Sequence, residues 1–200
     1  MLSILAIVAS YLLGSVSFSY LFGKWFKGID IRKHGSGNAG ATNTLRVLGK
    51  GPAILVLLLD GFKGVAAVLL GVWAASGPDH IWIRVLCGLA AIIGHNWPVY
   101  FGFRGGKGIA TTIGVMATLA FLPTLIAGIT AIVIIAVTRF VSLGSLILTA
   151  LLPFLLWGMD RPIPIVWISI LLCVFAFIRH RTNIVKLIQG KENKLGQKRA

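Results

Sequence analysis

Acidic residues are scarce in this chain: only five Asp and Glu occur among 200 residues, beside 19 Lys and Arg. So few carboxylates, none of them paired, argue against a two-metal catalytic site. Cysteine is equally rare, and both Cys87 and Cys173 lie inside apolar runs, which excludes a disulfide framework. No cluster of His and Cys suggests zinc. We therefore expect no metal and no cofactor.

Charged residues of either sign make up only 12% of the chain, against 57% hydrophobic residues. A soluble domain has roughly 25% charged residues. The composition therefore predicts an all-α, polytopic protein embedded in a lipid bilayer. A net charge of +14 would suggest nucleic acid as the partner of a soluble chain. In a membrane protein, basic cytoplasmic loops explain the excess charge, so no nucleic-acid partner is expected.

Apolar runs long enough to cross a bilayer, about 20 residues each, follow one another along the chain. The run 109–138 is too long for one straight span, and Pro123 tends to end or kink a helix, so we divide it by a tight turn near residues 121–124. The sequence then predicts a single transmembrane domain over residues 1–200, closed by a basic cytoplasmic tail at 179–200. Its seven spans are predicted at residues 2–23, 52–75, 81–101, 109–122, 124–138, 143–158 and 163–178.

Basic residues predict the orientation of these spans. With seven spans, sixteen of the 19 Lys and Arg fall on one side of the membrane, in three loops and the tail. The excess of Lys and Arg in cytoplasmic loops then places the N-terminus outside and the C-terminus in the cytoplasm. One long helix at 109–138 would spoil this alternation, so the charge pattern itself supports the division near Pro123.

A polar stretch from His34 to Arg46 (HGSGNAGATNTLR) interrupts the apolar sequence. Residues 35–40 match the pattern GxGxxG, but no strand precedes them, so we exclude a dinucleotide-binding unit. Glycines still let backbone N–H groups approach an anion, and the start of a following helix favours negative charge. Ser36 adds a hydroxyl donor and Arg46 a guanidinium fork. We interpret the stretch as a phosphate cradle, with a mobile surface loop as the alternative.

A second polar stretch covers residues 95–112 (HNWPVYFGFRGGKGIATT). Its glycines around Lys107 open directly into the fourth predicted span, which places a cation and N–H groups at a helix start on the cytoplasmic side. Alternatively, Arg104 and Lys107 are ordinary anchors at the membrane surface, although an anchor needs no flanking glycines. His95 and Asn96 fall inside the third span and should face protein or a cavity.

Two charged residues, Asp60 and Lys63, fall about 16 Å along the second span, near the middle of the bilayer. Ions at this depth are costly and are usually paired, and residues three apart share a helix face. One interpretation is a structural ion pair. The other is a polar cavity where the span is broken near Gly61, because residues 61–66 (GFKGVA) echo residues 105–110 (GGKGIA).

Four motifs carry a resemblance that extends along the chain from the first span to Glu192: residues 36–43 with Arg46, residues 95–99, residues 105–111 and residues 180–184. They resemble the bacterial acyl-phosphate-dependent glycerol-3-phosphate acyltransferases (the PlsY family). The resemblance implies an inner-membrane enzyme whose active site faces the cytoplasm. It implies transfer of a fatty acyl group from acyl phosphate to the sn-1 hydroxyl of glycerol 3-phosphate, giving 1-acylglycerol 3-phosphate and phosphate.

The same resemblance implies that neither acyl-CoA nor acyl carrier protein is needed, and a monomer is expected. Motifs and resemblance together predict three catalytic residues: Ser36, Arg46 and Lys107. Contacts to substrate or phosphate are predicted at Gly37, Asn38, Gly40, Ala41, Thr42, Asn43, Gly105, Gly106, Gly108, Arg139, Ser142, His180 and Asn183. Further candidates are Lys63, His95, Asn96, Arg104 and Glu192.

Three alternatives stay open. The general base is His34, His95, His180 or Glu192, or else a phosphate oxygen of the activated substrate takes the proton, which we favour. Ser36 is either a hydrogen-bond donor, which we favour because no base is fixed beside it in sequence, or an acyl-enzyme nucleophile. In another functional class, a transporter of a phosphorylated metabolite would also use cationic glycine loops, with helices broken at corresponding points of two halves.

Overall fold

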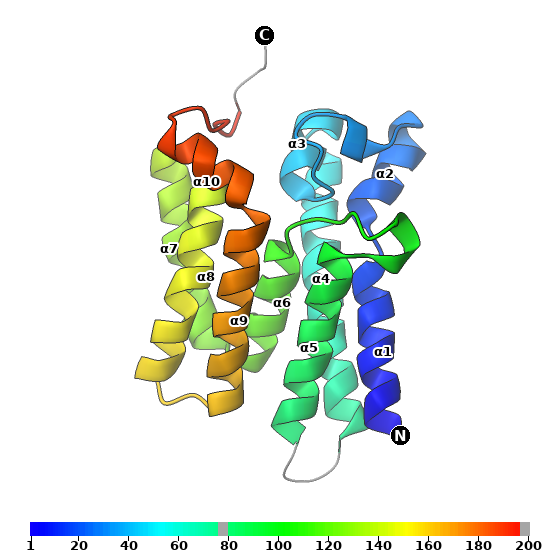
Figure 1. Cartoon of the computed structure of the whole chain (residues 1–200), viewed down its shortest axis with the longest axis vertical. Helices are drawn as coiled ribbons and strands as arrows, with labels where there is room; N and C mark the ends of the chain where they lie inside the picture. The colour runs from blue at the N-terminus through cyan, green and yellow to red at the C-terminus, as the bar shows by residue number, and fades with distance from the viewer. Residues whose placement is uncertain (76–79, 197–200) are drawn as a thin grey trace. The chain divides into compact units, whose positions relative to one another are not determined.

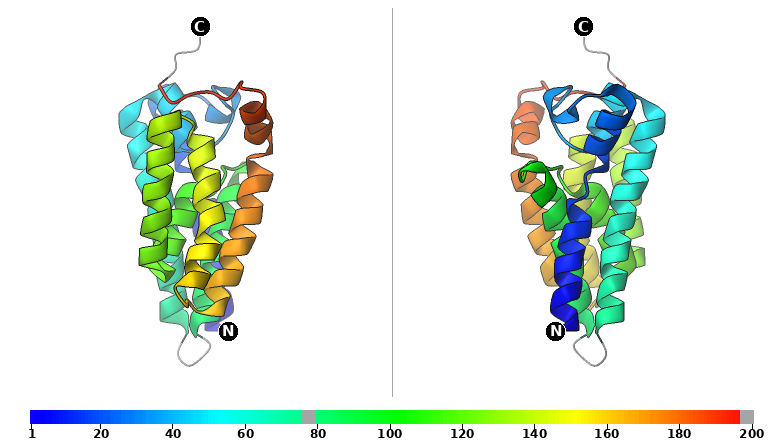
Figure 2. Two further views of the ribbon diagram at one scale, coloured as in Figure 1. Left: turned by 90° about the vertical axis from the view of Figure 1, so that its left-hand side faces the viewer. Right: turned by 90° about the vertical axis from the view of Figure 1, so that its right-hand side faces the viewer.

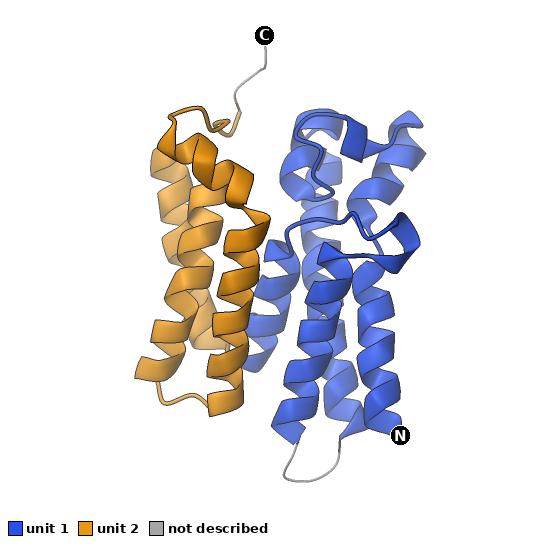
Figure 3. Ribbon diagram, in the orientation of Figure 1, with its two compact units in different colours: residues 1–119 blue, residues 120–200 orange. Residues whose placement is uncertain are grey.

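The structure is a computed structural model that describes residues 1–75 and 80–196, and over these residues it contains helices and loops but no strand. The prediction of an all-α protein is therefore confirmed. Lys198 and Arg199, two of the basic residues behind the predicted orientation, lie outside the described residues, as does the loop 76–79 between the second and third predicted spans. The chain forms two compact units, residues 1–119 and 120–200 (Figure 3). A single transmembrane domain stays a prediction.

Unit 1 is a set of apolar helices with a polar cap of loops. α1 packs against α5 and α4, and α4 packs against α5 and α6; the right-hand view of Figure 2 shows α1 and α4 side by side. Both glycine-rich segments lie in the half of this unit that is remote from the N-terminus (Figure 1). Its elements are α1 (Leu2–Ser15), α2 (Phe18–Lys27), η1 (Ile31–Lys33), α3 (Ala41–Leu48), α4 (Lys50–Ala74), α5 (His80–Asn96), η2 (Val99–Phe101) and α6 (Ile109–Leu119).

The first predicted span, 2–23, is in fact two helices, and α2 continues to Lys27. Val16 is extended (φ −67°, ψ 115°), and Ser17 caps α2 by accepting a hydrogen bond from the Tyr20 N–H at 3.4 Å. The Val16 carbonyl at the break accepts a hydrogen bond from Lys63 Nζ at 2.9 Å. In an apolar segment, backbone polar groups need such internal partners. No Pro or Gly marks this break, so the sequence did not predict it.

The suggested break of the second span near Gly61 is wrong, because α4 is continuous from Lys50 to Ala74. Its glycines instead allow close packing against α6. A Cβ on Gly114 would meet the Gly61 carbonyl oxygen, and a Cβ on Gly64 would lie 3.0 Å from the Val115 nitrogen. Small residues at such contacts let apolar helices approach closely. The similar residues 61–66 and 105–110 therefore have different structures: the first segment is helical, and the second is mostly loop.

The run 109–138 is divided as expected, but at Ala120 rather than at residues 121–124. α7 (Phe121–Thr138) starts immediately afterwards, with Pro123 in its first turn. Proline is tolerated there because the N–H groups of the first turn have no partner within the helix. Thr124 Oγ1 donates to the Ala120 carbonyl at 2.8 Å, which stabilises this start. Pro123 thus begins a helix instead of ending one.

Unit 2 contains α7, α8 (Val141–Gly158), α9 (Ile163–Arg179) and α10 (Arg181–Ile188). α7 packs against α8 and α8 against α9, as the left-hand view of Figure 2 shows. The region expected to be only a basic tail, 179–200, includes α10, which bends from α9 by 64°. α10 packs against both α8 and α9. In unit 1, the third predicted span is also shorter than expected, because α5 ends at Asn96, five residues before the predicted end of that span.

Within residues 1–75 and 80–196, four segments are long and apolar enough to cross a membrane, and a fifth qualifies if α9 and α10 count as one bent span. The four are Leu2–Lys27, Lys50–Ala74, Phe121–Thr138 and Val141–Gly158. α6 is apolar but has only 11 residues. Large apolar side chains on these helices are exposed, such as Leu58 at 61% and Ile132 at 66%. Such surfaces suit a lipid environment, since they would be costly in water.

Candidate active site

The first glycine loop, residues 34–40, is held by one buried side chain, Asn43. Its Oδ1 accepts a hydrogen bond from the Ser36 N–H at 2.8 Å. Its Nδ2 donates to the carbonyls of Ile31 at 3.1 Å and His34 at 3.0 Å. Asn43 is fully buried, and both amide hydrogens are used inside the loop. Asn43, expected from the sequence to offer donors to a phosphate, therefore fixes the loop instead.

The first glycine loop leads into α3, whose N-cap is Gly40. Thr44 Oγ1 donates to the Gly40 carbonyl at 3.1 Å and lies 2.8 Å from Ser19 Oγ, so α3 is joined to α2. Ser36 on the loop and Arg46 on α3 are exposed. The helix start, the hydroxyl and the guanidinium together form a surface suited to an anion.

An ion pair at the edge of this loop reaches the second polar stretch. Arg32 Nη2 lies 2.9 Å from Asp30 Oδ2, and Arg32 Nη1 donates to the Phe101 carbonyl at 2.8 Å. The Arg32 guanidinium also lies 4.9 Å from the centre of the Tyr20 ring. The hydrogen bond from Arg32 lowers the pKa of the Asp30 carboxyl and raises that of Arg32. η1 and η2 are thereby linked at their outer side.

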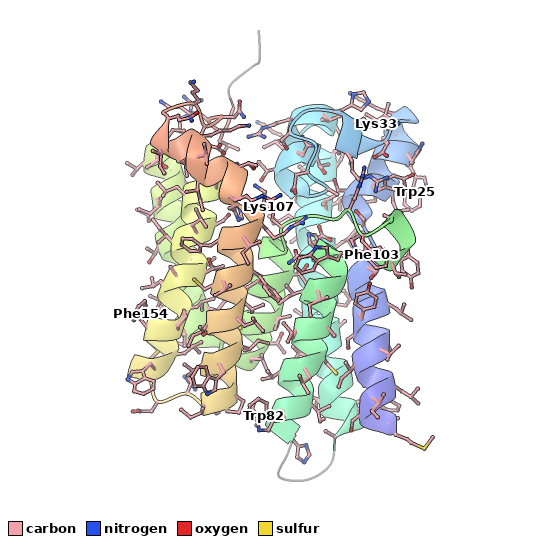
Figure 4. All side chains as sticks on the ribbon, viewed as in Figure 1. Trp25, Lys33, Trp82, Phe103, Lys107 and Phe154 are labelled. Atoms are coloured by element: carbon pink, nitrogen blue, oxygen red, sulfur yellow. The ribbon has the colours of Figure 1, made fainter. Side chains whose placement is uncertain are left out.

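The second glycine loop, residues 102–108, lies directly against the first. The Gly106 N–H donates to the His95 carbonyl at 3.1 Å. A Cβ on Gly106 would lie 2.6 Å from the Ala39 carbonyl oxygen and would also meet His95 Nε2. Only glycine fits between the imidazole and the first loop. In Figure 4, Lys107 and Phe103 mark the second loop and Lys33 the end of η1 just before the first loop, whereas Trp82 lies at the opposite end of α5.

The second glycine loop ends at the start of α6, where Gly108 has a positive φ of 80°. Lys107 is half-buried beside this helix start. Asn96 is 1% exposed, and a Cβ on Gly108 would lie 2.8 Å from its Oδ1. Neither polar atom of the Asn96 amide has a hydrogen-bond partner among the residues that the structure describes. Buried polar groups are normally paired, so this amide is a candidate for contact with a ligand.

Asp60 and Lys63 form the ion pair that their spacing predicts, with Lys63 Nζ 2.8 Å from Asp60 Oδ1. His95 joins them, because its Nδ1 lies 3.5 Å from the same oxygen. All three side chains are buried, at 1% exposure for Lys63, 3% for Asp60 and 6% for His95. The expectation that His95 faces protein is confirmed. Its link to Asp60 was not predicted, since no sequence pattern joins residues so far apart.

Unit 2 brings several predicted residues together at its own C-terminal segment. Ser142 Oγ donates to Glu192 Oε1 at 3.0 Å, and Asn183 Nδ2 donates to the same oxygen at 2.7 Å. Arg139 donates to the Leu195 carbonyl through Nε at 3.1 Å and Nη2 at 2.8 Å. His180 is buried, with Nδ1 2.8 Å from the Ala176 carbonyl. Ser142, Asn183 and Arg139 thus hold the segment after α10 in place, whereas His180 contacts the end of α9.

Comparison with known proteins gives the chain its family. The family model described as glycerol-3-phosphate acyltransferase matches residues 4–190. The chain belongs to the glycerol-3-phosphate acyltransferase family. Curated glycerol-3-phosphate acyltransferases of Shouchella clausii and Halalkalibacterium halodurans are 57% and 56% identical to it, each over 98% of this chain and over 98% and 96% of their own.

A solved structure gives the same result. The crystal structure of PlsY, described as an integral membrane glycerol 3-phosphate acyltransferase in its glycerol 3-phosphate form, has a TM-score of 0.91 and 36% identity. The match covers 97% of this chain and 96% of that chain. The resemblance seen in the sequence is confirmed: the protein is an acyltransferase and an integral membrane protein. The transporter alternative is not supported, because the family is one of acyltransferases and the break expected in α4 is absent.

Proposed function

We propose that the enzyme transfers a fatty acyl group from acyl phosphate to the sn-1 hydroxyl of glycerol 3-phosphate. The products are 1-acylglycerol 3-phosphate and inorganic phosphate. One observation carries the proposal: the first glycine loop, which leads into α3 with Arg46, and the second, which carries Lys107, meet where Gly106 lies against the Ala39 carbonyl. Two phosphorylated substrates need two such anion sites side by side. Related PlsY structures are described as glycerol 3-phosphate and lysophosphatidic acid forms, which agrees with this substrate and product.

In the proposed reaction, the glycerol hydroxyl oxygen bonds to the carbonyl carbon of acyl phosphate, and the bond from that carbon to the phosphate oxygen breaks. Negative charge develops on the carbonyl oxygen and then on the departing phosphate. We assign Arg46 and Lys107 to these charges, together with the Ser36 hydroxyl and the N–H groups of both glycine loops. Losing one such donor typically lowers kcat by about 10²–10³-fold. Asn96, with its buried amide beside Gly108, is a further candidate donor.

The hydroxyl proton passes to an oxygen of the substrate phosphate in this proposal. The contacts of three of the four candidate bases, His95, His180 and Glu192, support that route. His95 directs Nδ1 to Asp60 and its other edge to Gly106. His180 directs Nδ1 to a backbone carbonyl, and Glu192 Oε1 accepts two hydrogen bonds within unit 2. Ser36 acts as a donor; isolation of a labelled acyl-Ser36 ester would show instead that it is a nucleophile.

Four residues of unit 2 are also proposed to contact substrate. Contacts of Arg139, Ser142, His180 and Asn183 with substrate stay predictions from the family resemblance. In the structure, Arg139, Ser142 and Asn183 hold the C-terminal segment. A Ser142→Ala variant separates the two roles: loss of substrate contact raises KM with the thermal midpoint unchanged, whereas loss of the segment lowers that midpoint.

For the membrane arrangement, we propose seven spans in a bacterial inner membrane, with both glycine loops in the cytoplasm and the N-terminus outside. The α1–α2 segment, α4, α5, α6, α7, α8 and α9 supply the seven. α5 has 17 residues, which is about 26 Å of helix and nearly the thickness of the hydrocarbon core. A membrane-impermeant thiol reagent should label Lys33→Cys in inverted vesicles, which expose the cytoplasmic face, and not from the periplasmic side of intact cells. Labelling from the periplasmic side would reverse the proposed orientation.

The decisive experiment is an assay of purified protein with acyl phosphate and glycerol 3-phosphate, measuring 1-acylglycerol 3-phosphate and phosphate in equal amounts. Acyl-CoA and acyl carrier protein replace acyl phosphate in parallel reactions. We expect product from acyl phosphate alone, without any partner protein. Product only from acyl-CoA or acyl carrier protein would refute the proposed donor. A 2-acyl product would refute the proposed position.

A further inference from the structure

We infer that Asp60, Lys63 and His95 form a positioning network that sets the spacing between the two glycine loops. Its importance for catalysis rests on the proposed function, whereas its geometry does not. The three side chains are almost fully buried, so they act through their neighbours rather than on a dissolved substrate. The network runs from the break between α1 and α2 to the contact between Gly106 and Ala39.

Lys63 forms the end of the network that controls the first glycine loop. Its Nζ lies 2.8 Å from Asp60 Oδ1 and donates to the Val16 carbonyl at 2.9 Å. Val16 is the point at which the chain leaves α1, and α2 then leads through residues 28–30 and η1 to the first loop. The ammonium group also lies 5.9 Å from the centre of the Phe18 ring. Lys63 thereby holds α2, and with it the approach to the first loop, against α4.

His95 forms the end that controls the second glycine loop. Because Asp60 Oδ1 lies 3.5 Å from Nδ1, the carboxylate favours the tautomer with the proton on Nδ1 and fixes the plane of the ring. The opposite edge of that ring packs against Gly106, and the His95 carbonyl accepts the Gly106 N–H at 3.1 Å. Gly106 is thus held by both the ring and the carbonyl of His95, and the Ala39 carbonyl oxygen of the first loop borders the same Cβ position as the ring.

The charges of the network argue for a positioning role. A buried ion pair contributes little net stability, and neutral replacements of both partners are often tolerated. The pair does, however, provide contacts of fixed direction, which apolar side chains cannot provide. Transfer of the acyl group from acyl phosphate to the hydroxyl of glycerol 3-phosphate depends on how the two bound substrates are aligned. A displacement of about 1 Å can cost about 10²-fold in rate. We therefore expect loss of the network to affect catalysis far more than folding.

The test removes both charges together with the double variant Asp60→Asn/Lys63→Met, which leaves no unpaired buried ion and removes the donor to Val16. We expect kcat to fall about 10- to 100-fold, while the thermal midpoint falls by only a few degrees because the Val16 carbonyl loses its donor. Ser169→Ala is the matched control. It deletes a buried hydroxyl of α9 that donates to the Val166 carbonyl at 2.7 Å, and its kcat should stay within about twofold of the wild type.

The spacing itself is measured by electron paramagnetic resonance between spin labels on Lys33→Cys and Phe103→Cys. Both positions are exposed, and Cys87→Ala and Cys173→Ala remove the native thiols. We expect one narrow distance distribution in the wild type and a shifted or broadened one in the double variant. This measurement needs no turnover. If the wild type makes no product from acyl phosphate, the proposed function fails, and the distance still tests the network.

A fall in kcat together with a changed distance supports the inference. A fall in kcat at an unchanged distance overturns it, because the residues would then act on the chemistry directly. An unchanged kcat also overturns it, whatever the distance shows. If the double variant does not fold, His95→Gln takes its place under the same criteria, since it breaks the link to the second loop but leaves the Asp60–Lys63 pair intact.

Discussion

The two glycine loops of unit 1 have similar composition but are held in different ways. The first is held by Asn43, whose partners all lie within 12 residues of it in the chain. The second is held from outside, by His95 at the end of α5 and by the Ala39 carbonyl of the first loop. The first loop is therefore a local structure, whereas the second depends on helices that pack across unit 1. Four predictions test this difference, beginning with the largest effect.

Removing the basic residue of either loop should have the largest effect. We expect Arg46→Ala and Lys107→Ala each to lower kcat/KM by about 10²–10³-fold, because charge that develops on phosphate loses a fixed partner. Initial rates against each substrate show whose KM rises, and hence which phosphate each loop holds. Lys50→Ala, at an exposed lysine at the start of α4, is the control. Near-normal kinetics in both variants would show that Arg46 and Lys107 do not bind the substrate phosphates.

Gly106→Ala should come next, because the added Cβ would meet the imidazole of His95 and lie 2.6 Å from the Ala39 carbonyl oxygen. Separating the loops should lower kcat/KM about 10- to 100-fold. Gly128→Ala in α7 is the matched control, since its Cβ would have no neighbour within 4 Å. That change should leave activity intact and stabilise the helix by about 0.5–1 kcal/mol. Equal activities of the two variants would contradict the close contact between the loops.

Asn43→Ala should disturb the first loop alone. It removes three hydrogen bonds, each worth about 0.5–1.5 kcal/mol, so the thermal midpoint should fall by several degrees. Hydrogen exchange should speed up at residues 31–40 and stay unchanged at 102–108. Thr149→Val, at a buried hydroxyl of α8, controls for a general loss of stability. Equally fast exchange in both loops would show that the contact with Ala39, rather than His95, is what holds the second loop.

The smallest effect concerns pH and the Asp30–Arg32 pair. Because Arg32 lowers the pKa of the Asp30 carboxyl in the folded protein, the unfolded chain binds that proton more readily. The pair therefore adds to the free energy of unfolding above the usual Asp pKa of about 3.9. That contribution is lost as the pH falls through the lowered folded pKa. The pair is partly exposed, so the contribution should stay below about 1 kcal/mol.

Thermal midpoints from about pH 6 to about pH 3 measure this contribution, with Asp30→Asn as the comparison. The wild type should lose more stability than the variant over this range. An equal or larger loss in the variant would show that the Asp30–Arg32 pair adds no stability above the usual Asp pKa.

The parts of the fold that were predicted correctly depend on neighbours in sequence. Asp60 and Lys63 were expected to pair because residues three apart share a helix face, and they do. The break at Val16 was missed because both flanking segments are apolar and Lys63, its partner, is 47 residues away. Pro123 was taken as a helix end, although a first-turn position suits proline equally well.

The candidate site residues show the same contrast between features set by neighbours in sequence and features set by distant contacts. The composition of the two glycine stretches was enough to predict them as anion-binding loops. The role of Asn43 needed coordinates, because its amide suits a phosphate as well as a backbone carbonyl. The link between His95 and Asp60 also needed coordinates, because it depends on the packing of α4 against α5.

The sequence by itself determined the class of the protein, its family and the two cationic glycine stretches, because hydropathy, charge and motif spacing are properties of the chain. Only the tertiary structure decided which groups hold those stretches. Helix packing brings Val16, Lys63, His95 and Gly106 together, and buried polar atoms take whichever partner that packing places within hydrogen-bond distance.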